Sequence, residues 1–121
     1  MDLAVVDRLW DALAAGNVDA ACDCLTPDAR VWHSYDRDPQ NVETTHKAWT
    51  GFVGAFPERE FTDIRRQPTQ TGCVQQQTMI VRTQGGTRKA WPVCIVARIE
   101  DGRIARLDEY VDRAGSYDPD A

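Results

Sequence analysis

The residue with the clearest chemical potential in this sequence is Glu109, an acidic residue inside an alternating apolar pattern near the C-terminus. Ala105, Leu107 and Val111 share its spacing of two, so a β-strand at this position places all four side chains on one face. Burial among aliphatic neighbours disfavours a charged carboxylate and raises its pKa, which suits the group to general acid or base chemistry near neutral pH. The simpler alternative is that Glu109 lies at the end of the sheet and reaches water or an arginine.

Two turns predict which side chains share the face of Glu109. Gly85-Gly86 fits a two-residue hairpin turn with both residues at positive φ. Residues 100–102 fit a three-residue loop that ends on a left-handed glycine. Counting along both ladders, the predicted inner face contains Val74, Gln76, Thr78, Ile80, Trp91, Val93, Ile95, Ala97, Ala105, Leu107, Glu109 and Val111. The polar side chains of Gln76 and Thr78 would then accompany Glu109.

Three helices and five strands are predicted to position these residues. Apolar side chains at helical spacing predict helices over residues 2–15 and 18–25, and Asn41 begins a third helix that ends at Pro57. A β-branched and aromatic run predicts an early strand over residues 29–35. The period then changes to two and predicts strands over residues 61–67, 74–83, 88–100 and 103–113. Helices gathered first and strands last indicate the α+β fold class.

Length and composition indicate one ordinary globular domain. The chain has 121 residues, of which 42% are hydrophobic and 27% charged. We expect a single domain over residues 1–114 and a polar tail over 115–121 that frays. With 14 Lys and Arg against 19 Asp and Glu, the net charge is −5, and no basic stripe suggests binding to nucleic acid. No apolar run approaches the roughly 20 residues of a membrane span.

The N-terminus and the cysteines predict a cytoplasmic protein without a metal site. Met1-Asp2-Leu3-Ala4 lacks the basic and apolar regions of a signal peptide, so the four cysteines are expected as reduced thiols. Cys22 and Cys24 are two residues apart, which is not the spacing of a zinc or redox motif, and no histidine flanks the others. We therefore expect structural thiols and no cofactor.

Two segments carry a resemblance to a known family. Residues 31–36 (VWHSYD) and 101–112 (DGRIARLDEYVD), in this order after three predicted helices, resemble the SnoaL-like branch of the nuclear transport factor 2-like superfamily. The resemblance covers residues 3–113. It implies a cone-shaped α+β fold in which three N-terminal helices pack on a curved, mainly antiparallel sheet around a largely apolar pocket. Relatives such as ketosteroid isomerase, limonene epoxide hydrolase and polyketide cyclases act on small apolar molecules without a metal, whereas other members only bind partners.

Carried over residue by residue, the resemblance implies a site that is partly changed. Glu109 holds the position of a catalytic acid in limonene epoxide hydrolase. Gln76 and Thr78 match the positions of an Arg and an Asp in that enzyme, so its charged relay is missing. Trp32 and Ser34 match positions where relatives have Tyr and Asn, or the isomerase's base Asp, and a serine cannot replace that base.

Two further catalytic candidates lie on or just after the early strand. Asp36 could reach the mouth of the pocket, although an exposed position in the loop is the favoured alternative. His33 is a residue type that commonly shuttles protons, but a regular strand turns it away from the pocket and only a bulge brings it inward. The predicted ligand-binding residues are Trp32, Ser34, Trp49, Gln76, Thr78, Trp91 and Val93.

Together these features predict a small cofactor-independent enzyme that binds a compact molecule of polyketide, steroid or terpenoid type. Glu109 would transfer a proton during isomerisation, cyclisation, dehydration or hydration. A non-catalytic binding protein of the same fold is the alternative. A third interpretation is a dimerisation module, because the outer face of the last strand carries Tyr110 among charged residues. We expect a homodimer through this outer face.

Overall fold

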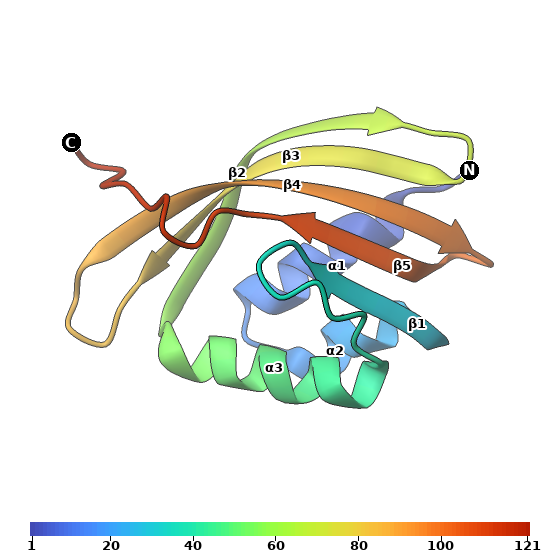
Figure 1. Cartoon of the computed structure of the whole chain (residues 1–121), viewed down its shortest axis with the longest axis horizontal. Coiled ribbons are helices and arrows are strands. Elements are labelled where there is room, and N and C mark those ends of the chain that lie inside the picture. Colours follow the sequence, from blue (N-terminus) through green and yellow to red (C-terminus); the bar gives the residue numbers. More distant parts are fainter.

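A computed structural model describes residues 1–121 and shows three helices covering one face of a curved five-stranded sheet (Figure 1). The helices are α1 (Ala4–Ala14), α2 (Val18–Asp23) and α3 (Val42–Ala55). The strands are β1 (Leu25–His33), β2 (Glu58–Pro68), β3 (Gly72–Arg82), β4 (Arg88–Glu100) and β5 (Arg103–Tyr110). The α+β class is thereby confirmed. With 14 residues, α3 is the longest helix, and none of the three is long and apolar enough to cross a membrane.

Capping side chains and a proline determine where the helices begin and end. Asn17 caps α2 by accepting a hydrogen bond from the Ala20 backbone N–H at 3.0 Å, and Asn41 caps α3 in the same way at 2.9 Å from Thr44. Phe56, the residue after α3, has an extended backbone because Pro57 disfavours helical geometry in the residue before it. The inward side of α1 is apolar and forms much of the core through Val5, Val6, Leu9, Trp10 and Leu13.

The sheet is mixed and has the strand order β1-β5-β4-β3-β2. Strand β1 runs parallel to β5, and the other three pairs are antiparallel. The early strand starts at Leu25, four residues before its predicted beginning, and stops at His33. This parallel pairing, which local sequence does not encode, places the end of β1 beside the end of β5.

The β3–β4 hairpin differs from the prediction by one residue. Thr83 and Thr87 flank a three-residue loop that ends on Gly86 at φ +88°, in place of the predicted two-residue turn. A one-residue slip sends every side chain to the opposite face. Gln76 is therefore exposed, and Thr78, opposite Pro92, shares its face. The predicted pocket-facing positions of Gln76 and Thr78 are wrong.

The β4–β5 hairpin keeps the predicted face of Glu109 by another route. Asp101 and Gly102 form a two-residue turn at φ +50° and +77°, and an irregularity between Arg98 and Ile99 then shifts the register. Glu109 consequently pairs with Ile95 instead of the predicted Val93. The observed and predicted partners of Glu109 are two residues apart on β4, and side chains two residues apart point to the same face. Glu109 therefore still points inward.

The C-terminal tail pairs with the sheet, contrary to the predicted fraying. Ala90 and Tyr117 exchange two backbone hydrogen bonds of 2.9 Å, and Arg88 forms an ion pair with Asp120. The indole N–H of Trp91 donates to the Arg113 carbonyl at 3.1 Å. The chain after β5 thus holds one side of the cavity described below.

Arg59 of β2 joins the C-terminal ends of two helices. Its guanidinium donates to the carbonyls of Leu13 at 2.8 Å and Ala14 at 3.2 Å, at the end of α1. It also donates to the carbonyls of Val53 at 3.4 Å and of Phe56, at the end of α3. A cation at these termini satisfies carbonyls that lack helical partners and complements the partial negative charge of both helix ends.

Replacing Arg59 with methionine should therefore lower the free energy of unfolding by about 3 kcal/mol, because several charge-assisted hydrogen bonds disappear together. Urea denaturation measures this change. Arg65→Met on the same strand is the matched control, since Arg65 forms only an exposed ion pair with Asp63 and should cost less than about 1 kcal/mol. Equal losses for both variants would contradict the role given to Arg59.

Candidate active-site pocket

A cavity of about 500 Å³ lies between the helices and the sheet and is lined mostly by hydrophobic residues. Helices α1 and α3 form one side, and every strand, or the segment directly after it, contributes to the other. Six large aromatic side chains line it: Trp10, Trp49, Phe52, Phe56, Phe61 and Trp91. Pockets of this size and lining suit small, largely apolar ligands.

Polar side chains gather at one end of this cavity. They belong to His33, Tyr35, Glu109 and Arg113. The parallel pairing of β1 with β5 sets His33 directly opposite Glu109, and the imidazole Nε2 lies 3.5 Å from the carboxyl Oε1. Both side chains are largely buried, with exposed fractions of 10% for His33 and 17% for Glu109. This distance is slightly longer than a good hydrogen bond, so the pair is close but not locked.

Burial shifts both groups of this pair toward their neutral forms. Burial raises the pKa of Glu109 from 4.5 to about 7. Burial also lowers the pKa of His33, an effect that Asp36 opposes and Arg113 reinforces through their charges. Near neutral pH the carboxyl group is therefore divided between its two protonation states while the imidazole is mostly neutral.

Arg113 brings a cation to this polar end. Its guanidinium carbon lies 4.6 Å from the centre of the Tyr35 ring, a cation–π geometry. Six other arginines form ion pairs with carboxylates, whereas Arg113 forms none. Burial raises the pKa of the Tyr35 hydroxyl, and the charge of Glu109 adds to that rise while Arg113 opposes it.

Four of the sequence-predicted site residues line the cavity. They are His33, Trp49, Trp91 and Glu109. His33 does so although a regular strand was expected to turn it outward, because the inward residues of β1 are Ala29, Val31 and His33. The charged Arg30 has the opposite parity and stays exposed, which is the signal in the sequence that could have shown this.

Trp32 and Ser34 occupy the opposite side of β1, so their predicted pocket positions are wrong. The Trp32 ring packs on Tyr110 at 5.2 Å between centroids, on the face of the sheet away from the helices. The hydroxyl of Ser34 accepts from the Val111 N–H at 3.1 Å and donates to its carbonyl at 3.2 Å. Ser34 therefore fastens the end of β1 to the chain after β5.

Asp36 and Val93 also lie outside the lining. Asp36 is exposed in the loop after β1 and accepts the Asp38 backbone N–H at 3.0 Å. It acts on the pocket only through its charge, which raises the pKa of His33. Val93 is 5% exposed and belongs to the hydrophobic core.

The inner positions of β3 belong to Gln75 and Gln77, which are 0% and 2% exposed. The side-chain amide N–H of Gln75 donates to the side-chain oxygen of Gln77 at 2.8 Å. The side-chain oxygen of Gln75 accepts a hydrogen bond from Arg66, which also forms an ion pair with Asp7. The charged Arg and Asp of limonene epoxide hydrolase thus have no charged equivalent at these inner positions.

Tyr35 and Arg113 also line the cavity, although neither was predicted from the sequence. Both continue the alternation that starts at His33 and Glu109, so extending the period of two beyond each strand end would have found them. No group of three or more His, Cys, Asp or Glu side chains is arranged to hold a metal ion. The polar end therefore offers a carboxyl, an imidazole, a phenol and a guanidinium to a bound molecule.

A comparison with known protein families shows which family this chain belongs to. The model of the SnoaL-like domain matches residues 6–107, which include α1 through most of β5. The chain belongs to the SnoaL-like family. No curated protein matches its sequence. Membership of this family agrees with the fold and with the resemblance carried by residues 31–36 and 101–112.

Several solved structures share the fold of this SnoaL-like protein at low sequence identity. A proposed polyketide cyclase from Xanthomonas campestris has a TM-score of 0.80 at 15% identity, covering 90% of this chain and 88% of that chain. An epoxide hydrolase of the limonene type from M. tuberculosis has a TM-score of 0.78 at 21% identity, with coverages of 91% and 81%. A protein with a ketosteroid isomerase-like fold from Catenulispora acidiphila, in complex with trimethylamine, has a TM-score of 0.78 at 13% identity, with coverages of 88% and 83%.

The raised pKa of Glu109 should make the stability of the protein depend on pH. The folded state holds its proton up to about pH 7 and the unfolded state only to about 4.5, so stability falls as pH rises between these values. Glu109→Gln should therefore be more stable than the wild type at pH 8 by roughly 3 kcal/mol, and by less than about 1 kcal/mol at pH 5.

Urea denaturation at both pH values measures this gap. Asp108→Asn removes the adjacent carboxylate, which lies on the other face of β5 and pairs with Arg106, and should show no comparable growth of the gap with pH. A gap for Glu109→Gln that stays constant with pH would show that the carboxyl group is not desolvated.

Proposed function

We propose that this SnoaL-like protein is an enzyme that moves a proton within a compact, largely apolar molecule, with Glu109 as the acid or base. One observation carries the proposal: a buried carboxyl group with a pKa of about 7 lines an aromatic cavity of about 500 Å³. A general acid or base is most effective when its pKa lies near the working pH. Active sites are places where burial shifts pKa values, so a perturbed carboxyl group in a cleft is a candidate for a functional residue.

The ionised form of Glu109 would begin the reaction by accepting a proton from a ligand carbon beside a carbonyl group. The C–H bond breaks, an O–H bond forms on the carboxyl group, and the electron pair moves into the carbonyl as an enolate. Glu109 then returns the proton to the far carbon of a conjugated enolate, which shifts the double bond and gives isomerisation. Alternatively it protonates a β-oxygen whose C–O bond breaks as the enolate electrons form a C=C bond, which gives dehydration. No oxidant or second substrate enters this sequence.

His33 would act beside Glu109 as a proton donor or acceptor. Its neutral imidazole lies 3.5 Å from the carboxyl group and has a second nitrogen, Nδ1, that is buried without a hydrogen-bond partner. A neutral imidazole offers one donor and one acceptor, so it can orient a ligand oxygen or relay a proton. Trp49 and Trp91 would hold the ligand and keep water away from the exchanging proton.

Several reactions of related enzymes are distinguishable at this site. Hydrolysis of an epoxide by the charged relay of limonene epoxide hydrolase is disfavoured, because Gln75 and Gln77 occupy the inner positions of β3. Isomerisation, cyclisation and dehydration need only the carboxyl group and its neighbours, and hydration needs one water molecule in addition. We therefore favour these reactions on a polyketide, steroid or terpenoid type of substrate.

Glu109→Gln should lower kcat/KM by about 10²–10⁴-fold, because the amide can neither accept nor release the proton. A thermal-shift screen of small ketones and lactones supplies ligands, and each ligand is then assayed for turnover. In the wild type, kcat/KM should change with an apparent pKa near 7, and Asp108→Asn should keep full activity. Ligands that stabilise the protein without any product would favour the binding-protein alternative, and unchanged turnover in Glu109→Gln would exclude the proposed mechanism.

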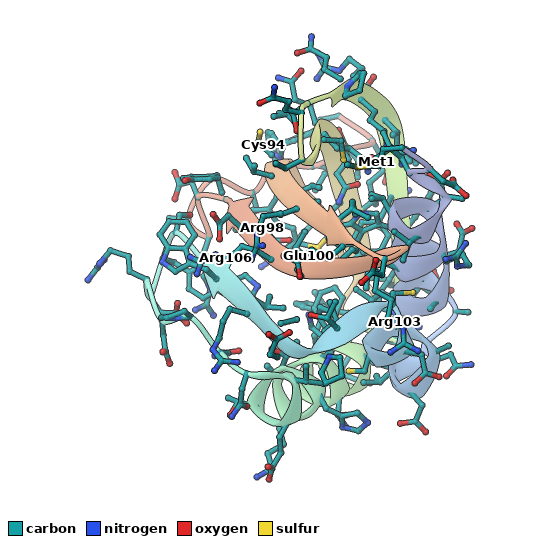
Figure 2. All side chains as sticks on the ribbon, turned by 90° about the vertical axis from the view of Figure 1, so that its right-hand side faces the viewer. Met1, Cys94, Arg98, Glu100, Arg103 and Arg106 are labelled. Carbon is teal, nitrogen blue, oxygen red and sulfur yellow. The ribbon has the colours of Figure 1, made fainter.

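The outer face of the sheet is the proposed homodimer interface. Cys94, Arg98 and Arg106, labelled in Figure 2, share this face of β4 and β5. The face also presents apolar surface, since Val96 is 38% exposed and Tyr110 is 48% exposed. A second copy packed there would cover both side chains without closing the cavity, which opens between the helices and the inner face.

Sedimentation equilibrium should give twice the 13.6 kDa mass of the chain. Tyr110→Asp should shift the protein to the monomer mass, because it places a charge within the apolar patch of the proposed interface. Tyr117→Asp serves as control, since Tyr117 is equally exposed at 47% but lies on the tail. A wild-type monomer at all concentrations would contradict the interface.

A further inference from the structure

The polar end of the cavity has an unusual charge balance. Arg113 is the only cation among the lining residues, and no carboxylate forms an ion pair with it. Glu109, the one acidic residue of the lining, is close to half protonated at neutral pH, and His33 is mostly uncharged there. The formal charge of the lining residues is therefore positive up to about pH 7, and the exposed Asp36 in the loop after β1 adds a negative charge that acts on His33 and Tyr35 from outside the lining.

The surroundings of Arg113 hold its guanidinium at the polar end. It stacks on Tyr35 at 4.6 Å, and its charge acts on both Tyr35 and His33. Its own carbonyl accepts the indole N–H of Trp91, so the backbone at this position is fastened to an aromatic lining residue. A guanidinium stacked in this way keeps free N–H groups in its plane, and these suit the two oxygens of a carboxylate.

Aromatic surface lies next to this cation. Trp91 and Phe56 pack edge to face at 6.3 Å, and Phe52 packs on Phe56 at 5.5 Å, so one wall of the cavity is a continuous aromatic surface. A planar apolar body could lie along this wall while a negatively charged group at its end reaches Arg113. Arg113 is exposed at this end of the cavity, so beside a neutral ligand of the same shape its guanidinium keeps only water as a partner, whereas a carboxylate adds a charge-assisted contact.

The geometry points to an aromatic or similarly apolar carboxylic acid as the ligand of this pocket, with Arg113 as the residue that binds its carboxylate. This inference rests on the proposed function, because it concerns the same cavity and names the class of its substrate. It assigns Arg113 to ligand binding and leaves proton transfer to Glu109.

Three naphthalene compounds with different side groups test the assignment: 2-naphthoate, 2-naphthylmethanol and 2-naphthylmethylammonium. Binding is followed by quenching of tryptophan fluorescence, since three tryptophans line the cavity. For the wild type at pH 6.5, naphthoate should bind at least about tenfold more tightly than the alcohol, as expected for a charge-assisted contact. The ammonium compound should bind most weakly.

The variants distinguish the contribution of the Arg113 charge to binding affinity from the contribution of the apolar wall. Arg113→Gln should weaken naphthoate by about tenfold and leave the alcohol within about twofold, whereas Arg113→Lys should keep part of the preference. Arg65→Gln makes the same change in net charge on exposed β2 and should alter neither affinity. Melting curves confirm that each variant is folded.

The inference is overturned if the alcohol or the ammonium compound binds as tightly as naphthoate, if Arg113→Gln weakens naphthoate and alcohol equally, or if no compound gives saturable quenching. These probes are bound and not converted, so the result does not depend on catalysis. Glu109→Gln should still bind naphthoate, and its effect on turnover tests the proposed function separately.

Discussion

The desolvation of one carboxyl group is the interaction from which the chemistry of this pocket follows. An exposed glutamate is fully ionised at neutral pH, but the Glu109 side chain is only 17% exposed and its pKa rises to about 7. Arg113 and His33 are close enough to influence a bound molecule, yet neither forms a tight ion pair that would hold Glu109 in its charged form. A direct guanidinium–carboxylate pair would instead lower the pKa of the acid. The spacing of these groups therefore keeps the acid reactive.

Strand pairing and the C-terminal segment create that spacing. The parallel contact between β1 and β5 aligns His33 with Glu109, and Ser34 fastens this edge through both of its bonds to Val111. The chain beyond β5 then carries Arg113 to the cavity and receives the indole hydrogen bond of Trp91. On the other side, Arg59 secures the ends of α1 and α3, whose side chains complete the aromatic wall. The site is thus assembled from elements far apart in the sequence.

Whether a side chain was predicted on the correct face of the sheet depended on which local signal in the sequence indicated that face. The inward orientation of Glu109 was predicted because Leu107 and Val111 flank it at a spacing of two. Gln76 and Thr78 were misplaced because Gly85-Gly86 fits both a two-residue turn and the end of a three-residue loop, and the choice reverses every side chain. Trp32 was placed inward because it matches a pocket position of related enzymes. Arg30, however, has the same parity, and its charge cannot be buried cheaply on that face.

By itself the sequence determined the order of helices and strands, the α+β class and the presence of an acid within an apolar strand face. These properties are local, since period, caps and turn residues act within a few positions of the chain. Only the tertiary structure decided that His33, Tyr35 and Arg113 meet Glu109 at one end of an aromatic cavity. Their proximity depends on a parallel pairing between strands separated by about seventy residues and on hairpin registers that near-equivalent turns leave open.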